Sequence, residues 1–160
     1  MLVEIPFTRS LLFTALEQSP LFFEYLLKDL TEEEADQRPD PERFTIREVV
    51  AHVAEWETIF LERMQLTCAH QHPVAPAYDP NELAARHNYA GTDVAEQFAN
   101  YCASRAQTVK FLRARTDVQW PRLAHREGFG DFSLEAQALH VTLHDGYHHR
   151  QIAHWRSITK

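Results

Sequence analysis

The clearest helical signal in this chain is the stretch FTIREVVAHVAEWETIFLERMQLTCAH, residues 44–70. Thr45 is followed three residues later by Glu48, a capping box in which each side chain bonds the backbone N–H of the other residue, so a helix begins here. Beyond the cap, apolar residues recur at helical spacing, at Ile46, Val49, Val53, Trp56 and Phe60. The stretch therefore predicts a long helix with one buried face.

A second long helix is predicted near the C-terminus, where LHDGYHHRQIAHW, residues 143–155, follows an N-cap at Ser133. At about 100° per residue, His144 lies at the centre of the inward face, with His140 and His148 close on either side. The same helical wheel assigns to the solvent side Glu135, Thr142, His149, Arg150 and Arg156. Three histidines are therefore expected in a row, one turn apart, facing the interior.

Two further helices are expected, over about residues 7–30 and 93–115, and Ser19–Pro20 either kinks the first or starts a new turn in it. Loops that contain proline or glycine are expected over 31–44, 72–80 and 117–132. No alternating strand pattern occurs anywhere in the chain. The predicted fold class is all-α, a four-helix bundle with long crossover loops, in one domain spanning residues 1–160.

Composition and charge exclude several classes of function. The net charge of −7 argues against a nucleic-acid partner, because phosphates require a basic surface. No stretch approaches the roughly 20 apolar residues that span a bilayer, and MLVEIPFTRS at the N-terminus lacks the features of a signal peptide. The two cysteines, Cys68 and Cys102, form no disulfide framework, so a cytoplasmic location is expected.

The row of histidines needs a physical explanation, because unpaired polar groups facing a core are costly. Two imidazoles four residues apart on a helix can bind one divalent ion, and a third ligand is then expected from a facing helix. His52, in REVVAHVAEWE, lies at the edge of the apolar stripe of its helix. Spacing alone leaves hydrogen-bonded core histidines as the alternative to a metal site.

Taken together, FTIREVVAHVAEWE, HDGYHHRQI and the chain length resemble the DinB-like family, which includes metal-dependent hydrolases and bacillithiol transferases. The resemblance covers essentially the whole chain. It implies a single divalent metal inside a four-helix bundle, bound by one histidine of the second helix and a His-x-x-x-His pair of the last. Those positions are His52, His144 and His148. The resemblance also implies a homodimer.

Three other residues are candidates for supporting roles at such a site. His140 is a further ligand, a hydrogen-bonding partner of a ligand, or a satisfied core residue. Glu55, about one turn after His52, is a candidate base or ligand-orienting carboxylate, with a solvated surface charge as the alternative. Gln151 points inward near His148 and is expected to hold a ligand or a water.

Three histidines leave a divalent ion with at least one open position, which is typical of catalytic sites. Water bound there has a pKa lowered towards about 7, which predicts a metal-dependent hydrolase acting on a small molecule. Activation of a thiolate is the alternative and predicts a thiol S-transferase; a non-catalytic, stress-related metal-binding module is a third possibility. Imidazole ligands suit zinc or nickel best, with manganese or iron as other candidates.

Overall fold

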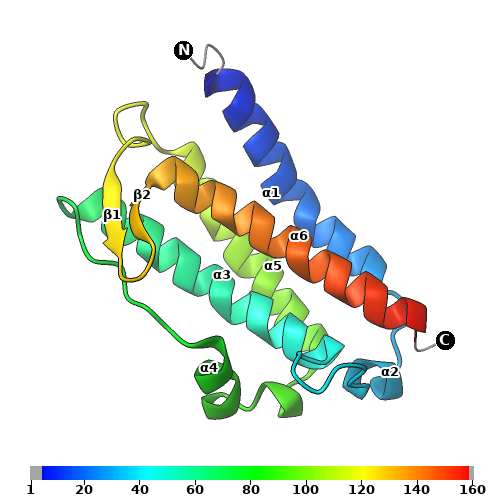
Figure 1. The fold of residues 1–160 in the computed structure, drawn as a ribbon. Coiled ribbons are helices and arrows are strands. Elements are labelled where there is room, and N and C mark those ends of the chain that lie inside the picture. Colours follow the sequence, from blue (N-terminus) through cyan, green and yellow to red (C-terminus); the bar gives the residue numbers. More distant parts are fainter. Residues whose placement is uncertain (1–4, 159–160) are drawn as a thin grey trace.

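The computed structural model describes residues 5–158 and confirms the bundle of four long helices. They are α1 (Ile5–Leu27), α3 (Ile46–Ala69), α5 (Val94–Arg113) and α6 (Leu134–Ile158). Both α1 and α3 pack against α5 and α6, so α1 and α3 occupy opposite corners of the bundle (Figure 1). This arrangement brings the two long histidine-bearing helices, α3 and α6, into direct contact.

Helix α3 begins at the predicted capping box. Thr45 Oγ1 accepts the N–H of Glu48, and Glu48 Oε2 accepts the N–H of Thr45 at 2.8 Å. Arg38 donates to both oxygens of the Glu48 carboxylate, at 2.7 and 2.8 Å. The loop that precedes α3 is thereby held against the helix, and it carries the Phe44 carbonyl that accepts hydrogen bonds from α6.

Helix α1 runs without interruption from Ile5 to Leu27 with Pro20 inside it, so no new helix begins at Ser19–Pro20. Proline has no N–H, so the carbonyl of Leu16, four residues earlier, lacks its helical partner. Arg105 of α5 supplies that partner, because its Nη1 donates to Leu16 O at 3.1 Å. A buried guanidinium of α5 therefore supplies the hydrogen bond that the proline removes from α1.

The same guanidinium joins all four long helices. Arg105 is 2% exposed, and its Nε and Nη2 donate to the two oxygens of Glu57 on α3 at 2.9 and 2.7 Å. Its Nη2 also lies 2.7 Å from Asp145 Oδ2 on α6. Buried charges are tolerated when they are paired and hydrogen-bonded, and this cluster satisfies that condition with one cation between two carboxylates. Asp145 is the neighbour of His144, so the cluster also fixes α6 beside the histidines.

Short elements fill the connections between the long helices. They are α2 (Glu32–Asp36), α4 (Pro80–Arg86) and the 3₁₀ turn η1 (Tyr89–Gly91). The Asp79 carboxylate caps α4 by accepting the N–H groups of Asn81 and Glu82, at 2.7 and 3.0 Å. In Figure 1, α4 lies below α3, within the long crossover that leads from α3 to α5.

The segment expected to be a loop, residues 117–132, contains most of a short β-hairpin. An antiparallel hairpin, β1 (Leu123–Arg126) and β2 (Gly130–Ser133), precedes α6 and pairs Leu123 with Ser133 and Arg126 with Gly130. The turn uses positive φ at Gly128 and Gly130, 78° and 89°, which glycine adopts without steric cost. Four-residue strands are too short to show an alternating pattern, and for that reason the sequence did not reveal them.

The helical wheel of α6 is wrong for His149, which was expected to face solvent. Its ring centroid lies 4.1 Å from that of Phe23 on α1, and its Nε2 lies 3.3 Å from Ser19 Oγ. The reason is that α6 packs against α1 as well as α3 and so buries two faces.

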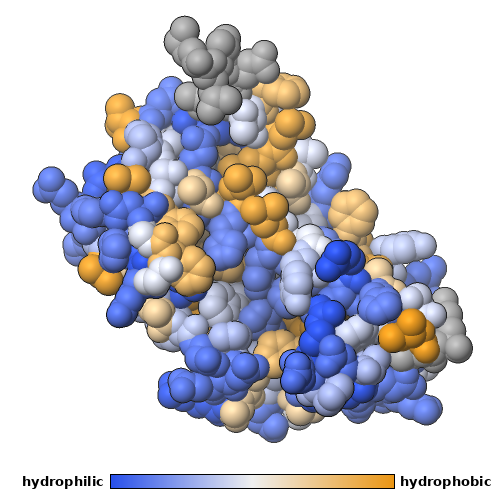
Figure 2. Space-filling model, viewed as in Figure 1, coloured by the Kyte–Doolittle hydropathy of each residue, from blue (hydrophilic) through white to orange (hydrophobic). Residues whose placement is uncertain are grey.

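Some hydrophobic side chains of α1 and α6 are exposed on the surface (Figure 2). The exposed ones on these helices include Phe7, Leu11, Leu139 and Leu143. None of the helices within residues 5–158 has both the length and the hydropathy needed to cross a bilayer.

Candidate metal centre

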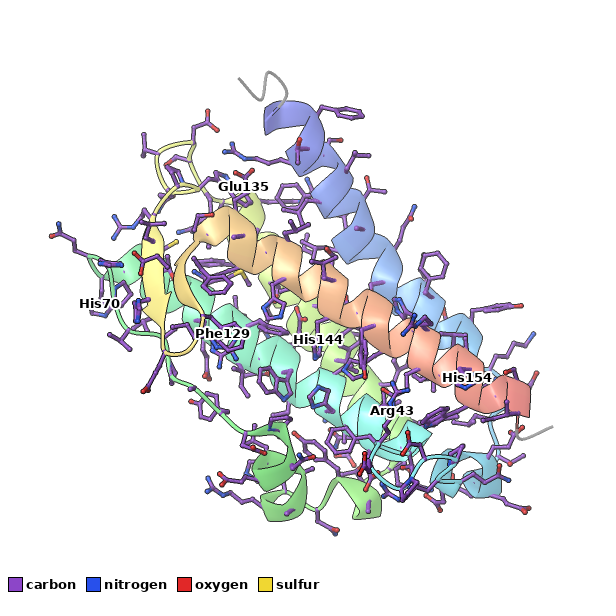
Figure 3. All side chains as sticks on the ribbon, viewed as in Figure 1. Arg43, His70, Phe129, Glu135, His144 and His154 are labelled. Atoms are coloured by element: carbon purple, nitrogen blue, oxygen red, sulfur yellow. The ribbon has the colours of Figure 1, made fainter. Side chains whose placement is uncertain are left out.

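Three imidazoles meet between α3 and α6, as the sequence predicts. His52, His144 and His148 each offer one ring nitrogen, and these nitrogens all lie within 4.8 Å of one another. His52 Nε2 is 3.0 Å from His144 Nε2, and the ring centroids are 4.6 to 5.0 Å apart. Figure 3 shows His144 on the side of α6 that faces α3. Two histidines of one helix and one of its neighbour therefore converge on a point.

The orientation of His148 is set by Gln151, one turn further along α6. Gln151 Nε2 donates to Phe44 O at 3.0 Å, which leaves its Oε1 to accept a hydrogen bond. That oxygen lies 3.2 Å from His148 Nδ1, so Nδ1 carries the proton and Nε2 of His148 keeps a free lone pair. Such a partner commonly fixes the tautomer of a metal-binding histidine. The predicted inward position of Gln151 therefore matches a ligand-orienting role.

The environment keeps all three rings neutral. Burial lowers the pKa of His148 to about 4, although Gln151 opposes the effect. Burial also lowers the pKa of His52 and of His144 well below the usual value, and the neighbouring His148 lowers both further. Neutral imidazole is the form that binds metal ions. At neutral pH, therefore, no protons need to leave these rings before a cation binds.

The donor set fits a divalent transition-metal ion. Two nitrogens bound about 2.1 Å from one ion are separated by roughly 3 Å, which is close to the spacing of His52 and His144. Hydrogen bonding alone satisfies the cluster poorly, because the contact between His52 Nε2 and His144 Nε2 uses one proton and Nε2 of His148 keeps a free lone pair. A cation would accept the lone pairs of all three rings at once.

The three histidines form part of the wall of a cleft of about 620 Å³. Aromatic rings make up much of the remaining lining, namely Phe44, Trp56, Phe60, Tyr78, Phe129 and Tyr147. Two arginines, Arg43 and Arg126, also line it. In Figure 3 the labels Arg43, His144 and Phe129 follow one another across the face between α3 and α6. The candidate metal centre is thus open to a small molecule rather than sealed in the core.

The structure places His140 and Glu55 in different surroundings. His140 lines the same cleft, with its ring 5.2 Å from that of Phe60, but it lies outside the group of three converging nitrogens. Glu55 accepts a short hydrogen bond from Tyr89 and lies 2.8 Å from His87 Nδ1. It does not line the cleft, so the structure brings His140 to the site and Glu55 to a neighbouring surface.

Several residues of the site were not anticipated from the sequence. Arg43, Phe44, Tyr78 and Phe129 come from loops, whose positions follow no periodic pattern, and Arg126 comes from the hairpin. The Arg105 cluster, which fixes α6 through Asp145, was also missed. A possible signal for it was the placement of Glu57, Arg105 and Asp145 near the apolar faces of three helices, where charged residues are rarely buried unless paired.

Comparison with known proteins agrees with this geometry. YfiT from Bacillus subtilis, described as a probable metal-dependent hydrolase with an unusual four-helix bundle topology, has a similar structure, with a TM-score of 0.84. The two chains are 22% identical over 91% of this chain and 84% of YfiT. A protein from Streptococcus pneumoniae is similar with a TM-score of 0.71 and 15% identity, over 93% of this chain and 90% of the other. These likenesses show the shared fold.

No curated protein matches the sequence. The model of the DinB superfamily matches residues 15–152, which include both histidine-bearing helices up to Ile152. The match covers most of the chain, in agreement with the resemblance seen in its motifs. The protein therefore belongs to the DinB superfamily.

Proposed function

We propose that this protein is a metal-dependent hydrolase that acts on a small molecule. The observation that carries the proposal is the convergence of His52, His144 and His148 on the wall of an open cleft. A divalent ion held there would supply a Lewis acid and activate water, the chemistry of hydrolysis at neutral pH. YfiT, described as a probable metal-dependent hydrolase, has the same fold and supports the proposal.

Other residues of the cleft orient a candidate ligand, exclude water and accept a proton. Gln151 holds the His148 ring so that its Nε2 faces the site. The aromatic walls exclude water from an apolar substrate, which strengthens the electrostatic interactions inside the cleft. His140 is the one cleft histidine outside the converging group, and burial, with the charges of Arg126 and Arg63, lowers its pKa. Its neutral ring is suited to accepting a proton during the reaction.

The test is an assay of protein loaded in turn with zinc, nickel, manganese and iron(II), using nitrophenyl esters, anilides and phosphates. The loaded protein should hydrolyse one of these classes faster than the metal ion alone, and His148→Ala should lose the activity. His154→Ala is the matched control, because His154 is an exposed histidine of the same helix. Loss of activity in both variants, or activity without metal, would contradict the proposal.

Transfer of a thiol to an electrophile is the second candidate, because the open cleft can admit a thiol beside the metal. Neither Cys68 nor Cys102 lines the cleft, so the thiol would come from a second substrate. The same loaded proteins should then consume a low-molecular-weight thiol in the presence of 1-chloro-2,4-dinitrobenzene. Binding of metal without either activity would favour a non-catalytic metal-binding module.

A further inference from the structure

Two arginines, Arg126 in the wall of the cleft and Arg63 in the wall of a small adjoining cavity, have no carboxylate partner among residues 5–158. Arg63 of α3 is only 5% exposed, and its Nε and Nη2 both donate to the single carbonyl of Pro76, at 3.1 and 2.6 Å. Arg126 of β1 has a buried Nε that bonds to nothing in the described part of the chain. The other two fully buried arginines of that part, Arg47 and Arg105, both form ion pairs, whereas Arg63 forms none and Arg126 is half-buried. The pair Arg63 and Arg126 is therefore electrostatically incomplete.

Burial without a counter-charge disfavours the charged form of both groups. Burial and the neighbouring charge of Arg126 lower the pKa of Arg63 to about 10, and burial lowers the pKa of Arg126. A buried cation without a counter-charge is energetically unfavourable. The chain has a net charge of −7, yet no carboxylate within residues 5–158 forms an ion pair with either arginine. An anion bound from solution would supply the missing counter-charge and stabilise the two arginines.

Two carboxylates line the cleft, those of Glu42 and Asp79, and neither forms an ion pair with Arg126. Asp79 is held by the backbone N–H groups that it caps at the start of α4. Glu42 adjoins Arg43, and Figure 3 places Arg43 across His144 from Phe129. Arg43 itself donates to Tyr147 Oη at 2.9 Å and lies over the Trp155 ring. Arg43 is thus held by aromatic partners on α6, whereas Arg126 has a buried Nε without a partner in the described residues.

The surroundings of Arg126 suit an acidic group attached to an apolar body. Its guanidinium lies 4.2 Å from the ring centroid of Phe129, and the cleft continues along Phe60 and Trp56. A small cavity of about 20 Å³, lined in part by Arg63, Arg126 and His140, adjoins the cleft and has room for about one water-sized group. His140 lies one helical turn before His144, roughly 6 Å along the axis. An anion at Arg126 would therefore lie about one turn of helix from the metal centre.

We propose that the cleft selects a small molecule that carries a carboxylate or phosphate on an aromatic or other apolar body, and that Arg126 is the residue that binds this acidic group. Arg63 adds positive charge behind Arg126, and the aromatic walls hold the apolar body. The bond that reacts then lies towards His52, His144 and His148. The assignment of the reacting end rests on the proposed function, whereas recognition of the acid by Arg126 requires neither metal nor turnover.

The test uses three naphthalene probes of nearly equal shape, 2-naphthoate, 2-naphthyl phosphate and the neutral 2-naphthamide. Their affinities are measured by fluorescence in metal-free protein that has been dialysed free of chelator, so that neither a metal ion nor a competing anion contributes. The variants are Arg126→Gln, Arg126→Lys and Arg43→Gln, with Arg150→Gln as a control that removes the same charge from an exposed position on α6. Circular dichroism verifies that each variant keeps its helices.

At least one of the two acids should bind about tenfold or more tightly than the amide, the effect expected of one charge-assisted hydrogen bond. Arg126→Gln should abolish this preference, Arg126→Lys should keep part of it, and Arg43→Gln and Arg150→Gln should preserve it. Which acid binds more tightly distinguishes a carboxylate from a phosphate. Equal affinity for acids and amide, failure of both acids to bind, or a preference lost in Arg43→Gln but kept in Arg126→Gln would overturn the proposal. Metal content and hydrolysis, measured separately, decide the proposed function.

Discussion

At the scale of single residues, the site depends on which nitrogen of each ring carries a proton. Gln151 settles this for His148, because its amide is itself oriented by the Phe44 carbonyl at the start of α3. One side chain therefore connects the N-terminal end of α3 to a candidate ligand of α6. His52 Nδ1, in contrast, has no partner, so nothing in the described chain fixes the tautomer of that ring.

Replacement of Gln151 by leucine should weaken metal binding without removing a ligand. The His148 ring would lose the acceptor at Nδ1, and loss of such a partner typically costs about 10- to 100-fold in affinity. Competition with a chromogenic chelator measures the change. Gln137→Leu is the matched control, since Gln137 lies on the same helix and donates to Thr67 Oγ1 instead. Equal affinities of the two variants would contradict the role given to Gln151.

The pKa shifts predict an unusually acid-resistant metal site. A proton competes with the metal only when the pH falls through the pKa of the folded ring, and burial lowers that pKa to about 4 for His148. Affinity should therefore change little between pH 7 and about 5 and fall steeply as the pH approaches about 4. Equilibrium dialysis against zinc over this range measures the profile. A loss of binding centred near pH 6.5, the value for exposed histidine, would contradict the burial argument.

At the scale of elements, the bundle is joined by a charge cluster as well as by an apolar core. Arg105 of α5 bonds the Leu16 carbonyl of α1, Glu57 of α3 and Asp145 of α6. The Leu16 carbonyl is free to accept a hydrogen bond from Arg105 because Pro20, which has no N–H, lies inside α1. A proline that would normally weaken a helix is here part of the contact between helices.

Arg105→Leu should destabilise the protein by about 3–5 kcal/mol, since it leaves two buried carboxylates without a counter-charge. The free energy of unfolding in urea, measured on metal-free protein, tests this value. Arg113→Leu removes an arginine of the same helix whose partner, Glu17, is exposed, and it should cost less than about 1 kcal/mol. Similar losses in the two variants would show that the buried cluster contributes no more than a surface pair.

Elements with a periodic apolar pattern were predictable from the sequence, and the others were not. The start of α3 at Thr45 and the start of α6 after Ser133 follow from caps next to long periodic segments. Helix α4 and the hairpin are too short to show a period, and tertiary contacts determine where they lie. His149 was misplaced because a wheel with one inward face does not describe a helix that packs against two neighbours.

At the scale of the whole molecule, the fold presents one cleft along the seam between α3 and α6. The histidines of its wall come from the two helices and were predictable, because spacing on a helix fixes which side chains share a face. The arginines and most aromatic rings come from connections, so their meeting follows only from the folded chain. The homodimer that the family resemblance implies stays a prediction, which light scattering of the purified protein can test.

The proposed function requires that His52, His144 and His148 together hold one divalent metal ion. Elemental analysis of tag-free protein, purified without chelator and reconstituted with zinc, tests it most directly. We expect about one equivalent of metal in the wild-type protein and in His154→Ala, and loss of most of it in His52→Ala, His144→Ala and His148→Ala. Wild-type protein without metal after reconstitution, or metal retained in all three ligand variants, would contradict the claim.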